Sequence, residues 1–145
     1  MACDFDIAIA DTASPTDRHE LAELLNEFNM ERTGYRDYRD LCCFLRDGDG
    51  QLVAGVDGFT WGGYAHVETV WVAEALRGRG LGRKLLEAAE AEAGARGCVT
   101  IVLSSHEFQA PDFYTRLGYE LAGATEDTPV GYRQLTFQKQ LGSRP

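Results

Sequence analysis

Residues 70–104 have the sequence VWVAEALRGRGLGRKLLEAAEAEAGARGCVTIVLS, and this stretch decides the fold. It opens on an apolar strand end and continues through a turn with glycine at positions 78, 80 and 82. Residues 81–96 then place apolar side chains at helical spacing, and Gly97 ends the helix. Residues 98–104 form a β-branched, apolar run that is typical of a strand buried on both faces. This order predicts a βαβ unit with two parallel strands and a right-handed crossover.

The segments around this unit predict the rest of the fold. Residues 4–11 alternate apolar and polar residues, which predicts a half-buried strand. Ser14 as N-cap and Pro15 in the first turn predict a helix that ends at Gly34. Two apolar runs around DGDG at 47–50 predict a hairpin, and a further strand follows Gly62. A short helix near residue 113 and two closing strands complete the order β-α-β-β-β-α-β-α-β-β, an α/β domain on a mixed sheet.

Length and composition indicate one globular domain, residues 1–145. The chain is 44% hydrophobic and 26% charged, as in soluble proteins. It contains no apolar run near the ~20 residues that a membrane span needs, and its N-terminus lacks the basic start of a signal peptide. We therefore expect a cytoplasmic protein with no membrane partner. The net charge of -9 also argues against nucleic acid as a partner, because such binding depends on neutralising phosphates.

Two patterns that could indicate a metal fail on inspection. The four cysteines, at positions 3, 42, 43 and 98, show no C-x-x-C spacing, and we expect them to be small apolar residues in strands. DGDGQL resembles a calcium loop only at its start, because Leu52 stands at the sixth position and Gly58 at the twelfth. The sequence therefore predicts no metal site.

The glycine turn is the clearest candidate for a ligand site. Glycine at 78, 80 and 82 exposes backbone N–H groups at a helix N-terminus, where an anion is favoured. Arg77, Arg79, Arg83 and Lys84 add positive charge, so phosphate or pyrophosphate is the natural ligand. The dinucleotide fingerprint G-x-G-x-x-G would need glycine at 83, and the ATP-binding G-x-x-x-x-G-K-[ST] pattern would need lysine there. Both patterns fail.

A different pair of motifs does match. Residues 77–82, RGRGLG, fit R/Q-x-x-G-x-G/A, and residues 113–120, FYTRLGYE, fit FYxxxGF. Together with the order of elements, they resemble the GNAT family of N-acetyltransferases. The resemblance implies a mixed sheet of six to seven strands with three to four helices and a central, splayed pair of parallel strands. It also implies transfer of an acetyl group from acetyl-CoA directly to a primary amine.

The resemblance assigns residues to the cofactor. Backbone groups of the strand end and the glycine turn would bind the pantetheine arm and the pyrophosphate; they belong to Val70, Trp71, Val72, Arg77, Gly78, Arg79, Gly80, Leu81, Gly82 and Arg83. Many family members carry Asn where Glu107 stands, so Gln109 is expected to supply amide contacts instead. Tyr114 matches the family tyrosine that faces the thioester sulfur and can protonate the departing thiolate.

The candidates for the general base lie on the strand before the glycine turn. Alternation with period two would place His66, Glu68, Val70 and Val72 on one face, so that the first two border the cofactor cleft. An alkyl amine is protonated at neutral pH and must lose its proton before it attacks. The family often carries an acid at one of these positions. Glu68 is favoured as the base acting through water, with His66 as alternative or relay partner.

The acceptor is expected beside the first helix, its following loop and the last hairpin. Residues there that suit a cationic amine are Glu31, Tyr35, Tyr38, Trp61 and Tyr132. A small-molecule amine is favoured over a peptide amine. Relatives in this family are often dimers, so a homodimer is an open expectation. The alternative function is a non-catalytic CoA-binding regulatory or interaction domain, which would need neither Tyr114 nor Glu68.

Overall fold

The structure is a computed structural model that describes residues 4–143. These residues form two compact units, which meet in sequence between residues 36 and 37. The prediction for Cys3 lies outside the described residues. The first unit contains α1 (Pro15–Thr33), and its predicted signals are confirmed: the Ser14 hydroxyl accepts a hydrogen bond from the Asp17 backbone N–H, and Gly34 ends the helix with φ +79°. Within residues 4–143, no helix is long and apolar enough to cross a membrane.

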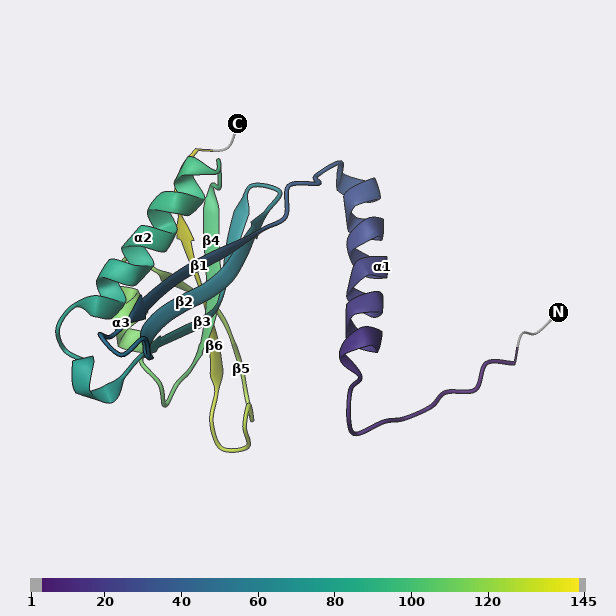
Figure 1. Ribbon diagram of the computed structural model, residues 1–145, viewed down its shortest axis with the longest axis horizontal. Helices are drawn as coiled ribbons and strands as arrows, with labels where there is room; N and C mark the ends of the chain where they lie inside the picture. Colours follow the sequence, from purple (N-terminus) through teal and green to yellow (C-terminus); the bar gives the residue numbers. More distant parts are fainter. Residues whose placement is uncertain (1–3, 144–145) are drawn as a thin grey trace. The chain divides into compact units, whose positions relative to one another are not determined.

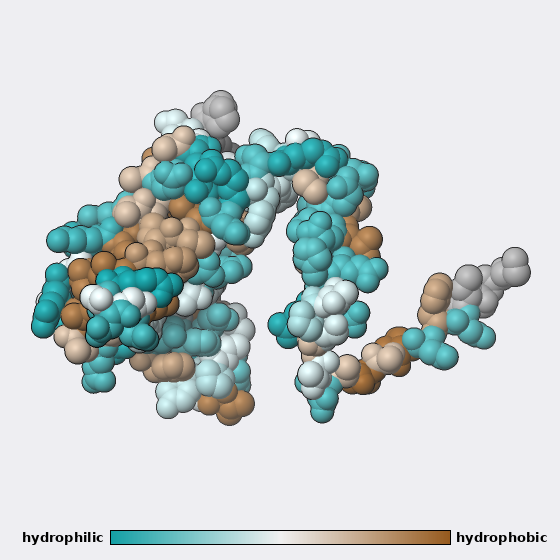
Figure 2. All heavy atoms as spheres, viewed as in Figure 1, coloured by the Kyte–Doolittle hydropathy of each residue, from teal (hydrophilic) through white to brown (hydrophobic). Residues whose placement is uncertain are grey.

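The predicted first strand is wrong. Residues 4–10 have no regular secondary structure, and they pair with none of the described strands. Figure 2 shows hydrophobic and hydrophilic residues following one another along this segment near the N-terminus. Alternation favours a strand only where a neighbouring backbone supplies hydrogen bonds. Ile7 and Ile9 accordingly remain 90% and 96% exposed.

The second unit is a six-stranded mixed sheet (Figure 1). Its strands, in the spatial order β1-β2-β3-β4-β6-β5, are β1 (Arg39–Arg46), β2 (Leu52–Trp61), β3 (Tyr64–Val72), β4 (Thr100–His106), β6 (Gln134–Gln140) and β5 (Glu120–Thr125). Strands β3 and β4 are parallel, and the other neighbouring pairs are antiparallel. The predicted βαβ unit is therefore confirmed, with α2 (Leu81–Ala95) as its crossover helix and the short η1 (Glu74–Leu76) before it.

One face of this sheet carries the core. Helices α2 and α3 (Pro111–Arg116) cover that face (Figure 1). Buried side chains from the helices and the facing strand positions include Leu86, Ala89, Ala93, Tyr114, Val56, Ala65, Ile101, Leu103, Leu135 and Phe137. Since side chains alternate along a strand, the even-numbered residues of β4 and β6 lie on the opposite face. The sheet thus separates a helix-covered face from a second, more polar face.

A β-bulge in β3 changes which residues share a face. Asp57 of β2 pairs with Thr69, but its neighbour Gly58 pairs with Val67, so Glu68 is an extra residue. Before the bulge Val67 is buried, and after it Val70 packs against the same core. The prediction that His66, Glu68, Val70 and Val72 share one face is therefore wrong, because the extra residue shifts the alternation by one position.

Candidate active site

The two central parallel strands separate at the bulge. Residues 64–67 of β3 pair with residues 100–103 of β4. Beyond these positions, residues 69–72 of β3 pair only with β2, and residues 104–106 of β4 pair only with β6. The predicted splayed pair is thus present. The free edge of β3 offers backbone groups to an extended ligand, as an unpaired strand edge does.

The glycine turn leads from the end of β3 to the N-terminus of α2. Gly78 and Gly80 have φ of +77°, a conformation that glycine adopts without strain. The first helical hydrogen bond runs from the Lys84 N–H to the Gly80 carbonyl, at 3.1 Å. Among the described residues, no acceptor bonds the backbone N–H groups of residues 78–83. Six free N–H groups at a helix N-terminus fit the pyrophosphate of CoA.

Position 82 leaves little room for a side chain. A Cβ at this position would lie 3.3 Å from Cζ of Phe113 and 3.7 Å from Cγ2 of Val72. The first turn of α2 therefore packs closely against both α3 and the end of β3. This contact brings the glycine turn, the free edge of β3 and Tyr114 of α3 into one region on the helix-covered face.

The basic side chains of the turn differ in their availability. The Arg77 Nε donates to the Val72 carbonyl at 2.8 Å, so this side chain ties the turn to the end of β3. Arg83 lies 3.8 Å from Glu87 in an exposed ion pair. Within residues 4–143, Arg79 and Lys84 form no ion pair or side-chain hydrogen bond. These two side chains are the cations that remain available to an anion.

Tyr114 is the one titratable side chain of α3 that is buried, with 8% of its surface exposed. Its ring packs against those of Phe113, Tyr119 and Phe137. Burial raises the pKa of the Tyr114 hydroxyl, so the group stays protonated at neutral pH. This hydroxyl has no hydrogen-bond partner among the described residues, whereas the Tyr119 hydroxyl donates to Glu90 at 2.9 Å. Tyr114 is therefore free to donate to a ligand.

A cavity of about 400 Å³ lies where β3 and β4 separate. It is lined by His66, Val67, Glu68, Ser104, His106, Gln109 and Gln134. The even-numbered lining residues of β4 and β6 place it on the sheet face opposite α2. The structure thus brings the two predicted bases, Glu68 and His66, into one cavity, with Glu68 at the bulge itself.

Aromatic rings flank this cavity on both sides. On the β2–β3 side, the Phe59 ring stacks on Tyr38 at 5.1 Å and meets His66 edge-on at 5.4 Å. On the other side, Phe108 lies between His106 and Tyr132, with both ring separations at 5.1 Å. The predicted acceptor residues Tyr38 and Tyr132 therefore belong to these two groups of rings.

The other predicted acceptor residues are placed differently. The Trp61 ring meets Tyr64 edge-on at 6.1 Å. Glu31 and Tyr35 belong to the unit of residues 1–36, so their role beside this site stays a prediction.

The side of the cavity formed by β2 and β3 has a negative electrostatic field. Burial and the nearby carboxylates of Asp40, Glu68 and Asp57 raise the pKa of the Tyr38 hydroxyl. Burial is the largest cause, and the three carboxylates add to it because each opposes the loss of the tyrosine proton. Acidic groups next to exposed aromatic rings favour a cationic ligand.

Gln109 and Glu107, which follow β4, are hydrogen-bonded within the protein, and the predicted contact of Gln109 with the cofactor stays a prediction. The Gln109 Oε1 accepts from the His106 backbone N–H at 2.8 Å, so this amide closes the turn after β4 on the acceptor side. Glu107, which stands where many family members have Asn, accepts from the Arg133 backbone N–H at 2.9 Å and from its Nε at 3.1 Å. It therefore joins the β5–β6 loop to the end of β4.

Four cavity residues were missed by sequence reasoning: Ser104, His106, Gln134 and Val67. The signal that could have found the first two is their even position on a strand whose odd positions are buried.

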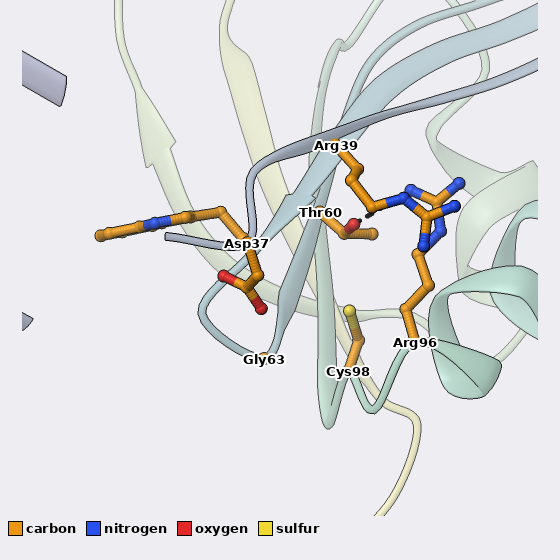
Figure 3. A pocket seen from close by; sticks show the side chains of 7 residues that line it. Asp37, Arg39, Thr60, Gly63, Arg96 and Cys98 are labelled. Atoms are coloured by element: carbon orange, nitrogen blue, oxygen red, sulfur yellow. Dashed lines mark hydrogen bonds between the residues drawn. The ribbon is translucent and has the colours of Figure 1, made fainter. Parts of the chain in front are cut away.

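A second, smaller cavity of about 100 Å³ is lined by Asp37, Arg39, Thr60, Trp61, Gly63, Arg96 and Cys98 (Figure 3). The Arg96 Nη1 donates to the Thr60 hydroxyl at 3.0 Å and to the Asp40 carbonyl at 2.9 Å, while its Nε pairs with Glu92 at 2.9 Å. These bonds fasten the C-terminal end of α2 to β1 and β2. We therefore assign this cavity a structural role.

Comparisons with known proteins identify the family. The profile of the Acetyltransferase (GNAT) family matches residues 8–119. The chain is 39% identical over 113 residues to blasticidin-S acetyltransferase of Streptomyces morookaense, covering 77% of this chain and 81% of that one. It is 32% identical over 136 residues to acetyltransferase Atu2258 of Agrobacterium fabrum, covering 94% and 99%. A crystal structure from Agrobacterium tumefaciens matches with a TM-score of 0.87 at 29% identity, over 94% and 99% of the two chains.

The fold and the site therefore define an acyl-transferring enzyme. The chain belongs to the acetyltransferase (GNAT) family, and its cosubstrate is acetyl-CoA.

Proposed function

We propose that the protein transfers the acetyl group of acetyl-CoA directly to a primary amine of a small, cationic molecule. The observation that carries this proposal is the opening between β3 and β4. Features suited to the cofactor lie on its helix-covered side, and a polar cavity with acidic and aromatic surroundings lies on the other. A donor and an acceptor entering from opposite faces would meet at this opening.

On the donor side, the free N–H groups of residues 78–83 would hold the pyrophosphate, with Arg79 and Lys84 adding charge. The unpaired edge of β3 near Val70 and Val72 would bind the pantetheine arm, and an N–H of that edge would stabilise the developing oxyanion. Tyr114 would donate a proton to the CoA thiolate as it leaves. Burial favours the protonated form that this role requires.

On the acceptor side, Glu68 would hold the ammonium group beside the opening and accept its proton through water. His66 is the alternative base, since it lines the same cavity. Once deprotonated, the amine attacks the thioester carbonyl, and no covalent acyl-enzyme is needed. The blasticidin-S acetyltransferase reported above supports a small-molecule acceptor; a peptide amine is the second candidate.

The proposal also includes the extent of the domain, the cellular location and the oligomeric state. The family match spans parts of both compact units, which supports a single acetyltransferase domain over residues 1–145. Cytoplasmic location and a homodimer stay predictions. The non-catalytic alternative would need no acid beside the cofactor, whereas Tyr114 offers a protonated hydroxyl with no hydrogen-bond partner among the described residues.

A thiol-release assay tests the proposal. Acetyl-CoA is mixed with a panel that contains blasticidin S, an aminoglycoside, a polyamine and peptides with free N-termini, and each product is weighed by mass spectrometry. We expect saturable release of CoA with at least one small cationic amine and a mass gain of one acetyl group. Turnover confined to peptides would contradict the acceptor class. Binding of acetyl-CoA with no turnover on any amine would favour the non-catalytic alternative.

A further inference from the structure

The hydrogen bond of His106, the last residue of β4, determines which nitrogen of its neutral ring carries the proton. His106 lines the cavity that is also lined by Glu68 and His66, and its Nδ1 lies 2.8 Å from the Thr128 carbonyl oxygen. A carbonyl oxygen only accepts hydrogen bonds, so Nδ1 carries the proton. In the neutral ring, Nε2 is then an unprotonated acceptor, and it has no hydrogen bond within residues 4–143. This is the form in which an imidazole can accept a proton.

The Thr128 carbonyl that sets this tautomer is held by its own loop between β5 and β6. The Thr128 backbone N–H donates to the Tyr132 carbonyl at 2.8 Å. Its hydroxyl donates to the Thr125 carbonyl at 2.7 Å and accepts from the Gln134 backbone N–H at 2.8 Å. The loop therefore presents this carbonyl to His106 from a fixed position.

An ion pair fastens the same loop to the end of β4. We call it the Glu107–Arg133 clamp: the Glu107 N–H donates to the Arg133 carbonyl at 2.9 Å, and the Glu107 carboxylate accepts from the Arg133 N–H and Nε. The backbone and side-chain donors of Arg133 lower the pKa of the Glu107 carboxyl, so the clamp is charged at neutral pH. The Phe108 ring stacks on His106 with an interplanar angle of 3°, which fixes the plane of the imidazole.

We propose that His106 accepts the proton of the acceptor ammonium and that the Glu107–Arg133 clamp positions it. The inference rests on the proposed function, in which Glu68 both holds the ammonium group and accepts its proton. Under this inference Glu68 only holds the ammonium group. The N–H bond of the ammonium breaks, and its proton moves to Nε2 of His106, directly or through one water. The freed lone pair attacks the thioester carbonyl, and the C–S bond breaks as the tetrahedral intermediate collapses. Tyr114 protonates the departing thiolate, the second proton of the nitrogen passes through water to restore the Tyr114 hydroxyl, and His106 releases its proton to solvent.

This assignment predicts a pH dependence with a definite sign. A protonated Nε2 has no lone pair to accept a proton, so the rate should fall toward the acidic side of the profile, and this acidic limb should depend on His106. The other titratable groups that border the cavity are Glu68 and His66 on β3; the charges of the Glu107–Arg133 clamp, next to it, cancel one another.

The experiment compares His106→Gln with the wild-type protein and with His19→Gln, a matched change on α1, which is exposed and outside the proposed machinery. Acetyl-CoA and the best amine of the panel are the substrates, between pH 5.5 and 9. For His106→Gln we expect kcat to fall about 100-fold and the acidic limb of the profile to disappear, with KM for acetyl-CoA unchanged. His19→Gln should match the wild-type protein throughout.

The role of the clamp is tested by Glu107→Gln. We expect kcat to fall by about tenfold and the acidic limb to move, while KM for acetyl-CoA is unchanged. A variant that loses only thermal stability and keeps the wild-type pH profile would show that the clamp does not position His106. Ring ¹⁵N NMR of the wild-type protein gives a readout that needs no activity, and we expect the Nδ1–H tautomer for His106.

The possible results separate a failure of this inference from a failure of the proposed function. A wild-type rate and an intact acidic limb in His106→Gln would overturn the inference while leaving the proposed function in place, as would an Nε2–H tautomer. A wild-type protein that binds acetyl-CoA but turns over no amine would instead defeat the proposed function, and the inference with it.

Discussion

The two halves of β3 differ in the number of neighbouring strands with which their backbones pair. Residues 64–67 have hydrogen-bonded strands on both sides, β2 and β4, and their side chains alternate regularly between the faces. Residues 68–72 keep only β2 and begin with the extra residue Glu68. The first half thus completes the sheet, and the second leaves an edge and an opening that a ligand can use. One strand serves both structure and function because a single inserted residue ends its pairing on one side.

Deletion of Glu68 removes the bulge that separates the two halves of β3, and it has the largest expected effect. Without the extra residue, Val67 and Thr69 would continue one regular register with β2, and the edge that faces β4 would shift. We expect turnover to fall at least about 100-fold, because misplacement by about an ångström has such effects, while the thermal midpoint changes little. Glu68→Ala keeps the bulge and is the matched control. Equal losses in both variants would show that only the carboxylate matters.

A substitution in the glycine turn tests whether this turn binds the cofactor beside the second half of β3. Gly82→Leu would place a side chain against Phe113 and Val72 at the start of α2, and we expect the Kd for acetyl-CoA to rise about 100-fold. Gly94→Leu makes the same change further along α2, where an added Cβ meets nothing within 4 Å. Isothermal titration calorimetry should give a wild-type Kd for this control. Undiminished affinity in Gly82→Leu would refute the assignment of the turn to CoA.

Tyr114→Phe removes the proposed acid beside the free edge. We expect kcat to fall about 10- to 100-fold with little change in KM for acetyl-CoA, since the ring and its packing remain. Tyr119→Phe is the control, because its ring contacts Tyr114 but its hydroxyl bonds to Glu90. That variant should lose thermal stability and retain kcat. A Tyr114→Phe variant that loses only cofactor affinity would contradict the acid role.

The smallest expected effect concerns stability in alkali. Burial raises the pKa of both Tyr114 and Tyr119, and Glu90 raises that of Tyr119 further. Above the ordinary tyrosine pKa of about 10, the folded protein therefore binds more protons than the unfolded chain, and the free energy of unfolding falls as pH rises. Thermal midpoints between pH 8 and 11 should show this decline. The decline should be shallower in Tyr119→Phe, and an unchanged slope there would contradict the assignment.

The sequence predicted those parts of the molecule that depend on local signals. The glycine turn, the caps of α1 and the βαβ order follow from residues that have few other conformational uses, such as Gly80 at positive φ. The strand predicted at residues 4–11 failed because alternation says nothing about whether a partner strand is present.

The candidate site was predicted only in part, for a similar reason. Glu68 was predicted and lines the cavity, while the catalytic roles of Glu68 and Tyr114 stay predictions. Period-two counting cannot detect a bulge, so the faces of Val70 and Val72 were misassigned. His106 and the Glu107–Arg133 clamp depend on contacts across 22 and 26 residues of sequence, which no local pattern reveals.

Initial-velocity kinetics test the central claim most directly, namely that donor and acceptor meet at the opening between β3 and β4. Rates are measured while acetyl-CoA and the amine are varied together, and the protein is weighed by mass spectrometry after incubation with acetyl-CoA alone. Direct transfer from opposite faces predicts intersecting lines in double-reciprocal plots and no acetyl group on the protein. Parallel lines together with an acetylated protein would contradict it.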